Sequence, residues 1–201
     1  MNVLKIAALA LITLVAVGLG ILLSGVFNVA ADDPHWAATQ WLLEAARDRS
    51  IAARAGGITV PPLGDPKQIG IGAEHYSQMC AKCHLAPGTE SSDLRRGLYP
   101  PPPNLVEHAS DLSPQETFWI IKHGLKMTGM PAWGATHDDA SIWAIVAFLP
   151  KLPELSPEAY RAIVGTQSAD AHPHEHAQHH DADEAGHDEG ALPKIGPAKG
   201  P

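Results

Sequence analysis

The chain of 201 residues contains two cysteines, and they lie three residues apart in the sequence Cys80-Ala81-Lys82-Cys83-His84. In a helix this spacing places both thiols on one side of a single turn, with the histidine directly after them. Two thiols so placed reach the two vinyl groups of one haem, and the histidine then lies beneath the iron. The pattern is the signature of covalent attachment and predicts one haem c. No cysteine remains for a disulfide framework.

Other uses of a cysteine pair remain open on spacing alone: a reactive dithiol, a local disulfide or half a zinc site. A thioredoxin-like dithiol needs a βαβ context, which this helical region lacks. A zinc site needs two more ligands from histidines elsewhere. An export signal supports the haem interpretation, because an oxidising compartment would otherwise pair the thiols.

The N-terminus supplies such a signal. Residues 6–27 form an apolar run long enough, as a helix, to cross a hydrocarbon core. We expect residues 1–30 to be a single-pass anchor in the inner (cytoplasmic) membrane. A cleaved signal peptide ending near residues 29–31 and a buried helix of a soluble protein are the alternatives. Lys5 before the run and Asp32 after it favour a domain on the periplasmic side.

Residues 31–64 are predicted to be a juxtamembrane helix and an extended linker. Asp33-Pro34 is typical of a helix start, so a helix is expected over residues 34–54. Trp36 and Trp41 follow the anchor closely. They suit either the membrane interface or packing on the main domain.

The main domain is expected over residues 65–164. Its apolar residues recur at helical spacing, and no segment alternates like a strand, so the predicted class is all-α with long loops. Helices are expected over residues 66–80, from the Ser113–Glu116 capping box to Gly124, from Thr136 to Pro150, and from Ser156 to about Val164, with residues 85–112 as a loop.

The second axial position has several candidates. Met130 precedes Pro131, which favours an extended backbone that projects the Met130 side chain from a loop. A thioether opposite a histidine raises the potential and suits electron transfer, so Met130 is the expected ligand. Met127 is an alternative ligand, as are His123 and His137 in a bis-histidine site. A further alternative is that both methionines are core residues and that neither binds the iron.

Residues 66–150 resemble a class I cytochrome c, and more narrowly the single-haem domains related to the cytochrome subunits of cbb-type haem–copper oxidases. The resemblance rests on motifs that occur in the family's order. These are Cys80-Ala81-Lys82-Cys83-His84, Pro103-Asn104-Leu105, Gly129-Met130-Pro131-Ala132-Trp133 and the final helix 142–149.

The resemblance implies the class I cytochrome c fold, in which Gly72 and Tyr76 would meet Ile145 and Phe148 where the first and last helices cross. It also implies a role at the haem for three further residues. The Pro103 carbonyl would accept the Nδ1–H of His84, which fixes the histidine's tautomer. Leu105 would pack on the haem face, and Trp133 would lie at the haem edge. Because four prolines occupy residues 100–103, which of their carbonyls faces His84 stays open.

Residues 165–201 are predicted to be a disordered, acidic tail. The net charge of −8 belongs mostly to this tail and argues against nucleic-acid binding. Interleaved histidines are typical of binding to copper, nickel or zinc; incidental composition and a pH-dependent role are the alternatives. The histidines are His172, His174, His176, His179, His180 and His187.

Together these patterns predict a membrane-anchored monohaem cytochrome that passes electrons between redox protein partners and is not an enzyme. The rival functions are a haem sensor or peroxidase with a displaceable distal ligand, and a metal-handling protein whose tail binds the ion.

Overall fold

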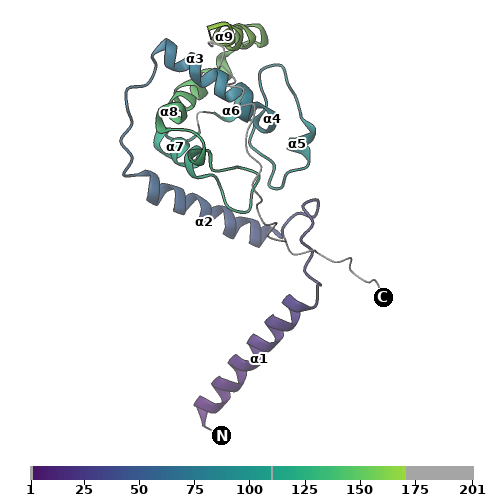
Figure 1. Ribbon diagram of the computed structural model, residues 1–201. Coiled ribbons are helices and arrows are strands. Elements are labelled where there is room, and N and C mark those ends of the chain that lie inside the picture. Colours follow the sequence, from purple (N-terminus) through teal and green to yellow (C-terminus); the bar gives the residue numbers. More distant parts are fainter. Residues whose placement is uncertain (1, 110, 171–201) are drawn as a thin grey trace, which may run out of the picture. The chain divides into compact units, whose positions relative to one another are not determined.

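The computed structural model describes residues 2–109 and 111–170 (Figure 1). Within these ranges every regular element is helical, which confirms the all-α prediction. Nine α-helices, one π-helical turn and two 3-10 turns make up the described part of the chain.

The first helix, α1 (Val3–Leu23), is apolar along its length and has no buried residue. At 1.5 Å per residue it is about 30 Å long, close to the thickness of a hydrocarbon core. By length and composition α1 is suited to be a membrane span or the apolar part of a signal sequence.

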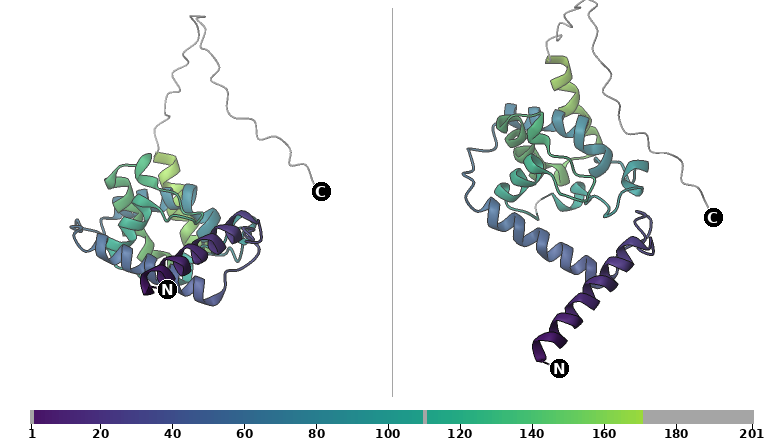
Figure 2. Two further views of the ribbon diagram at one scale, coloured as in Figure 1. Left: turned by 90° about the horizontal axis from the view of Figure 1, so that it is seen from below. Right: turned by 60° about the horizontal axis from the view of Figure 1, so that its bottom comes forward.

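The second helix, α2 (Ala37–Ala55), lies against α7 (Pro114–His123), as two further views show (Figure 2). Its buried residues are Ile51 and Ala55, both near its C-terminal end. The helix therefore belongs to the helical domain through its second half.

The predicted start of α2 at Pro34 is wrong, because the helix begins at Ala37. The backbone N–H of His35 donates instead to the hydroxyl of Tyr99 at 2.9 Å, and the two rings meet edge to face. A contact between residues far apart in sequence thus holds the chain before α2 out of the helix.

The third helix, α3 (Pro66–His75), begins as predicted. The Asp65 carboxylate accepts the Lys67 N–H at 2.7 Å, and Pro66 is the first helical residue. The helix continues through η1 (Tyr76–Cys80), a π-helical turn, into α4 (Ala81–His84). A π turn takes in an extra residue, so it rotates the next turn, which is α4, about the helix axis.

Two short helices interrupt the segment 85–112, which was expected to be all loop. These are α5 (Asp93–Arg96) and α6 (Leu105–His108). Ser92 caps the first by accepting the Arg95 N–H, and Asn104 caps the second by accepting the Val106 N–H. Four residues are too few to produce an apolar period.

The predicted capping box at the start of α7 is present. The Ser113 hydroxyl accepts the Glu116 N–H at 3.3 Å, while the Glu116 carboxylate accepts the Ser113 N–H at 3.1 Å. The helix ends at His123, and Gly124 follows with a φ of +63°.

The predicted helix start at Thr136 is wrong. Thr136 follows the short turn η2 (Trp133–Ala135), and its hydroxyl donates to the Trp133 carbonyl. The next helix, α8 (Asp139–Phe148), is capped by Asp138, which accepts the Ser141 N–H at 2.8 Å.

Helical structure also extends further than expected at the C-terminal side. Pro150 lies inside η3 (Leu149–Glu154), where the chain tightens from α to 3-10 geometry. The last described helix, α9 (Pro157–Asp170), runs past the expected end near Val164. The boundary predicted at residues 164–165 therefore lies within α9.

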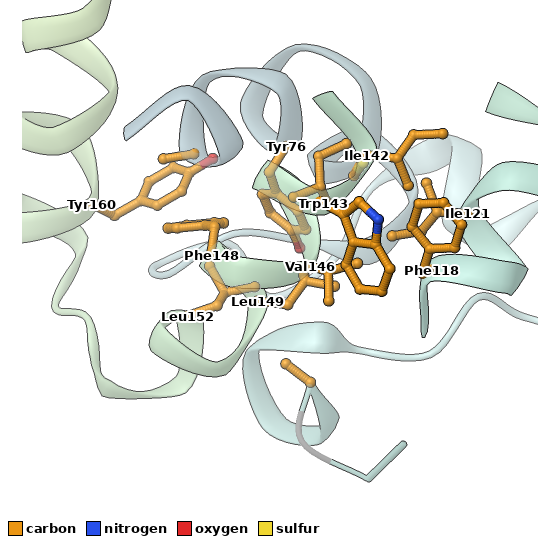
Figure 3. Packing of buried hydrophobic residues seen from close by; sticks show 14 residues of the cluster. Tyr76, Phe118, Ile121, Ile142, Trp143, Val146, Phe148, Leu149, Leu152 and Tyr160 are labelled. Atoms are coloured by element: carbon orange, nitrogen blue, oxygen red, sulfur yellow. The ribbon is translucent and has the colours of Figure 1, made fainter. Parts of the chain in front are cut away.

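The core is built where α3 and η1 lie against α8 (Figure 3). Seven consecutive residues of α8, from Ile142 to Phe148, are buried. The Phe148 ring contacts Tyr76 with centroids 5.6 Å apart, and Trp143 stacks on Phe118 at 4.1 Å.

Candidate functional site

The two cysteines lie on one turn where η1 passes into α4. Cys80 is buried, Cys83 is half-buried, and the two sulfurs are not joined in a disulfide. Burial, with Cys83 beside it, raises the pKa of the Cys80 thiol to about 12. The protonated thiol is therefore the favoured form of Cys80 in the folded chain.

The His84 imidazole is held by a contact from another part of the chain. Its Nδ1 lies 3.0 Å from the carbonyl oxygen of Pro103. Because a carbonyl can only accept, this bond makes Nδ1 the donor and leaves the Nε2 lone pair available as a ligand. Burial lowers the pKa of His84, partly opposed by the Pro103 bond. The neutral imidazole, which is the form that binds metals, is thus favoured.

The proline run presents one carbonyl to His84 and another to a guanidinium. Arg95 Nε donates to the Pro102 oxygen at 3.2 Å, while the Pro103 oxygen faces the imidazole. The structure thus answers which of the four proline carbonyls contacts His84.

Tyr76 ties the motif to the helix before it, a role that the sequence alone did not reveal. Its ring is fully buried, and its hydroxyl donates to the Leu85 carbonyl at 2.6 Å. Leu85 directly follows His84 and has a φ of +68°. A buried tyrosine hydroxyl needs a hydrogen-bond partner. That requirement was the signal that could have pointed to this bond from the sequence.

Met130 lies in a loop whose backbone is closed by its own hydrogen bonds. Its carbonyl accepts the Leu125 N–H at 3.2 Å, and its N–H donates to the Thr128 hydroxyl at 3.1 Å. A Cβ on Gly124 would lie 2.7 Å from the Met130 oxygen, so the close approach requires glycine there. The Met130 side chain is half-buried against the core.

The alternative distal residues lie in other surroundings. Met127 is 86% exposed with a φ of +58°. His123 is exposed, with its ring 5.1 Å from that of Trp119. The His137 Nδ1 lies 2.9 Å from the Thr136 hydroxyl. Of the two methionines, Met130 is the one packed against the core, and its role as ligand remains a prediction.

Residues 67–149 match the family described as cytochrome C oxidase, cbb3-type, subunit III. This segment is a c-type cytochrome domain, similar to that of the cbb3-type subunit. The match runs from α3 to the end of α8 and leaves α1, α2 and α9 outside it. No curated protein matches the chain significantly. A c-type cytochrome domain implies haem c, electron transfer and a location outside the cytoplasm.

The residues of the cytochrome domain fit a covalently bound haem. Two thiols lie one turn apart, and the ring nitrogen of His84 that does not face Pro103 is available for iron. Half-buried apolar side chains of the domain pack on the core from α4, α6, η2 and the loop before η2. Each keeps apolar surface exposed, and burying such surface against a hydrophobic group would be favourable. These side chains are Ala81, Leu105, Val106, Met130 and Trp133.

Leu105 and Trp133 each begin a short helical element of the cytochrome domain. Leu105 is the first residue of α6, and Trp133 is the first of η2. The Trp133 ring meets the His137 ring edge to face, with centroids 5.5 Å apart. Their placement at the haem face and edge remains a prediction.

The predicted histidine site of the tail, from His172 to His187, lies outside the described residues. Within residues 2–109 and 111–170, no group of three or more His, Cys, Asp or Glu side chains is placed to hold a metal ion.

Proposed function

We propose that the protein is a membrane-anchored monohaem cytochrome that carries single electrons between redox proteins on the periplasmic side of the cytoplasmic membrane. Cys80 and Cys83 would form the two thioethers, and His84 and Met130 would be the axial ligands. The observation that carries the proposal is the 3.0 Å contact between His84 Nδ1 and the Pro103 oxygen. It prepares this histidine to bind a metal through Nε2.

When bound, the haem supplies an iron that alternates between the ferrous and ferric states. The chain's contribution is to keep its ligands still. Pro103 orients the His84 imidazole and increases its basicity, and the closed loop around Met130 fixes the backbone from which the thioether projects. A ligand set that does not move between oxidation states favours fast electron transfer over substrate binding.

The surrounding apolar side chains would exclude water from the haem. Leu105, Met130 and Trp133 each pack, half-buried, against the core. An environment of this kind disfavours the more highly charged ferric state and raises the reduction potential, as does thioether ligation.

The layout of the chain supports tethering rather than free diffusion. The apolar helix α1 precedes α2 and the linker to Asp65, and the cytochrome domain follows. The family description names a subunit of a terminal oxidase. An oxidase of the cbb3 type is therefore the electron acceptor to test first.

The full chain, exported and matured in a bacterial host, should carry one haem that stays attached on a denaturing gel. Haem content per polypeptide is measured by the pyridine haemochrome assay. Cys80→Ser with Cys83→Ser should abolish attachment, whereas Ser91→Ala, an exposed change in the α4–α5 loop, should not.

Carbon monoxide separates the carrier from a sensor or peroxidase. The reduced protein should bind it slowly or not at all, because Met130 occupies the distal position. Rapid binding together with peroxide turnover would instead identify a displaceable distal ligand and overturn the carrier function.

A further inference from the structure

Helix α2 has an outward face that no other described element covers. Ile51 and Ala55 are its buried residues, on the side toward α7. With 3.6 residues per turn, the opposite face contains residues spaced by three or four, all exposed. They are Ala38, Leu42, Ala46, Arg49 and Ala53.

Large apolar side chains are also exposed around the N-terminal end of the helix. Leu42 lies on the outward face, while Trp41 lies about 100° from Leu42 around the helix, on the side that also carries Glu44 and Asp48. Trp36, just before the helix, is 85% exposed, Trp41 is 69% exposed and Leu42 is 61% exposed. Side chains of this size are rarely left in water together, and a cluster of them marks an interaction site. We define Trp36, Trp41 and Leu42 as the α2 patch.

The charged residues of α2 leave this outward face nearly neutral. Four of the five charged residues of α2 lie outside this face, and Arg47 pairs with Asp48 at 2.7 Å. Arg49 is the exception. A long arginine side chain beside apolar residues can extend its guanidinium toward water or lipid phosphate. This outward face therefore suits a partner surface that has an apolar interior and a polar boundary.

The position of the patch along the chain favours lipid as that surface. Leu23 ends α1, and Trp36 follows after thirteen residues, which span at most about 45 Å when extended. Hydrogen bonds fold this segment and shorten it: Asn28 Nδ2 donates to Asp33 at 2.9 Å, and the Asp33 N–H donates to the Ala30 carbonyl. Tryptophan side chains favour the region between lipid headgroups and acyl chains.

We propose that α2 lies on the bilayer that holds α1, with the α2 patch in the headgroup region. The proposal rests on the proposed membrane anchoring of α1, and it adds a second contact. Two points of attachment would hold the cytochrome domain in one orientation, where a single tether would leave it free to turn.

The proposed contact of α2 with the bilayer is linked through the chain to His84, the predicted haem ligand. His35, next to the patch, donates its N–H to the Tyr99 hydroxyl, and Tyr99 leads into the proline run that ends at Pro103. The Pro103 oxygen contacts His84. The α2 patch would therefore fix the height of the His84 side of the domain above the membrane.

Photolabelling from the lipid tests the contact directly. The full-length holoprotein is reconstituted in phosphatidylcholine–phosphatidylglycerol vesicles that contain a phospholipid with a diazirine at the top of its acyl chain. After illumination, labels are located by peptide mass spectrometry. We expect labels on α1 and on the peptide with Trp41 and Leu42, and none around Arg161 in α9.

The outcomes separate this proposal from the ones it rests on. Labels on α1 with none on the α2 patch would overturn the α2 contact while leaving the anchor intact. No label on either segment would overturn both the anchor and the contact. Haem content and the carbon monoxide response, measured on the same sample, report separately on the electron-carrier function.

Haem linear dichroism on aligned bilayers tests the fixed orientation. The triple variant Trp36→Gln, Trp41→Gln, Leu42→Gln should lose most of the dichroism of the Soret band. The control Leu94→Gln with Leu112→Gln removes exposed apolar side chains elsewhere and should keep it. Unchanged dichroism in the triple variant would overturn the proposal, and the labelling of the wild type decides the question even where that variant fails to mature.

Discussion

Gly72 in α3 lies directly against the backbone of Ala144 in α8. A Cβ built on Gly72 would come within 1.9 Å of the Ala144 oxygen and 2.9 Å of the Phe148 Cβ. The absence of a side chain therefore sets how closely the two core helices approach.

Replacing Gly72 by alanine should destabilise the domain, because the opposing atoms belong to a helix backbone and cannot move alone. Overpacking of this kind costs about 1–3 kcal/mol. Urea unfolding of the haem-loaded protein measures the loss. The matched change Gly165→Ala, where a Cβ meets nothing within 4 Å, should leave the midpoint unchanged or raise it. Equal midpoints for the two variants would show that the helices separate freely.

Replacing Met130 by alanine should abolish the weak sulfur–iron charge-transfer band of the oxidised protein and lower its reduction potential. Both effects follow from loss of the thioether ligand. Met127→Ala is the control, since that side chain is exposed, and it should change neither quantity. Spectroscopy of the oxidised protein and potentiometric titration provide the readouts. A band that survives in Met130→Ala would exclude Met130 as ligand.

His75 predicts a pH dependence of stability. Its pKa is lowered first by burial and then by His137, whose ring centroid lies 5.5 Å away, while Glu74 and Asp138 act in the opposite direction. The folded protein then binds fewer protons than the unfolded chain near the usual histidine value of about 6.5. Stability should therefore fall as the pH drops through that value toward the lower, folded-state pKa.

The variant His75→Gln should flatten this part of the stability profile. Urea unfolding at pH values from about 5 to 8 covers the window of histidine titration. Ser91→Ala, an exposed change without a titratable group, should keep the slope of the wild type. A slope unaffected by His75→Gln would assign the dependence to other groups.

The interleaved histidines of the tail predict metal binding that is independent of the haem. Truncation after Asp170 removes all six histidines from His172 to His187. The full chain should bind Cu²⁺, Ni²⁺ or Zn²⁺ at micromolar concentrations in calorimetric titrations, because neutral imidazoles favour these ions. The truncated protein should lose this binding and keep its haem spectrum. Identical heats from both proteins would mean that the tail histidines are incidental.

Local signals predicted the elements whose stabilising contacts are also local. The Ser113–Glu116 capping box and the Asp65 cap each involve neighbours in sequence, and both helices start where expected. The start of α2 was missed because the Tyr99 hydroxyl takes the His35 N–H, a contact that no local pattern encodes. Thr136 resembled a helix cap, yet its hydroxyl closes the turn before it.

The candidate site divides in the same way. The spacing of Cys80, Cys83 and His84 predicted its chemistry, because that signature lies in one short segment. The π turn from Tyr76 to Cys80 could not be predicted, since its sequence reads as an ordinary amphipathic helix. The bond from Tyr76 to Leu85 depends on that turn and on burial of the ring, so it too required the structure.

Helices α1 and α8 are the most apolar of the described helices, and they differ in length. That difference matters when the chain is exported across a membrane. Helix α8 has ten residues, mostly buried in the fold, and spans about 15 Å, half of a hydrocarbon core. A segment so short cannot bridge a bilayer, however apolar it is. Among the described helices, α1, twice as long, is the apolar one whose length matches a hydrocarbon core.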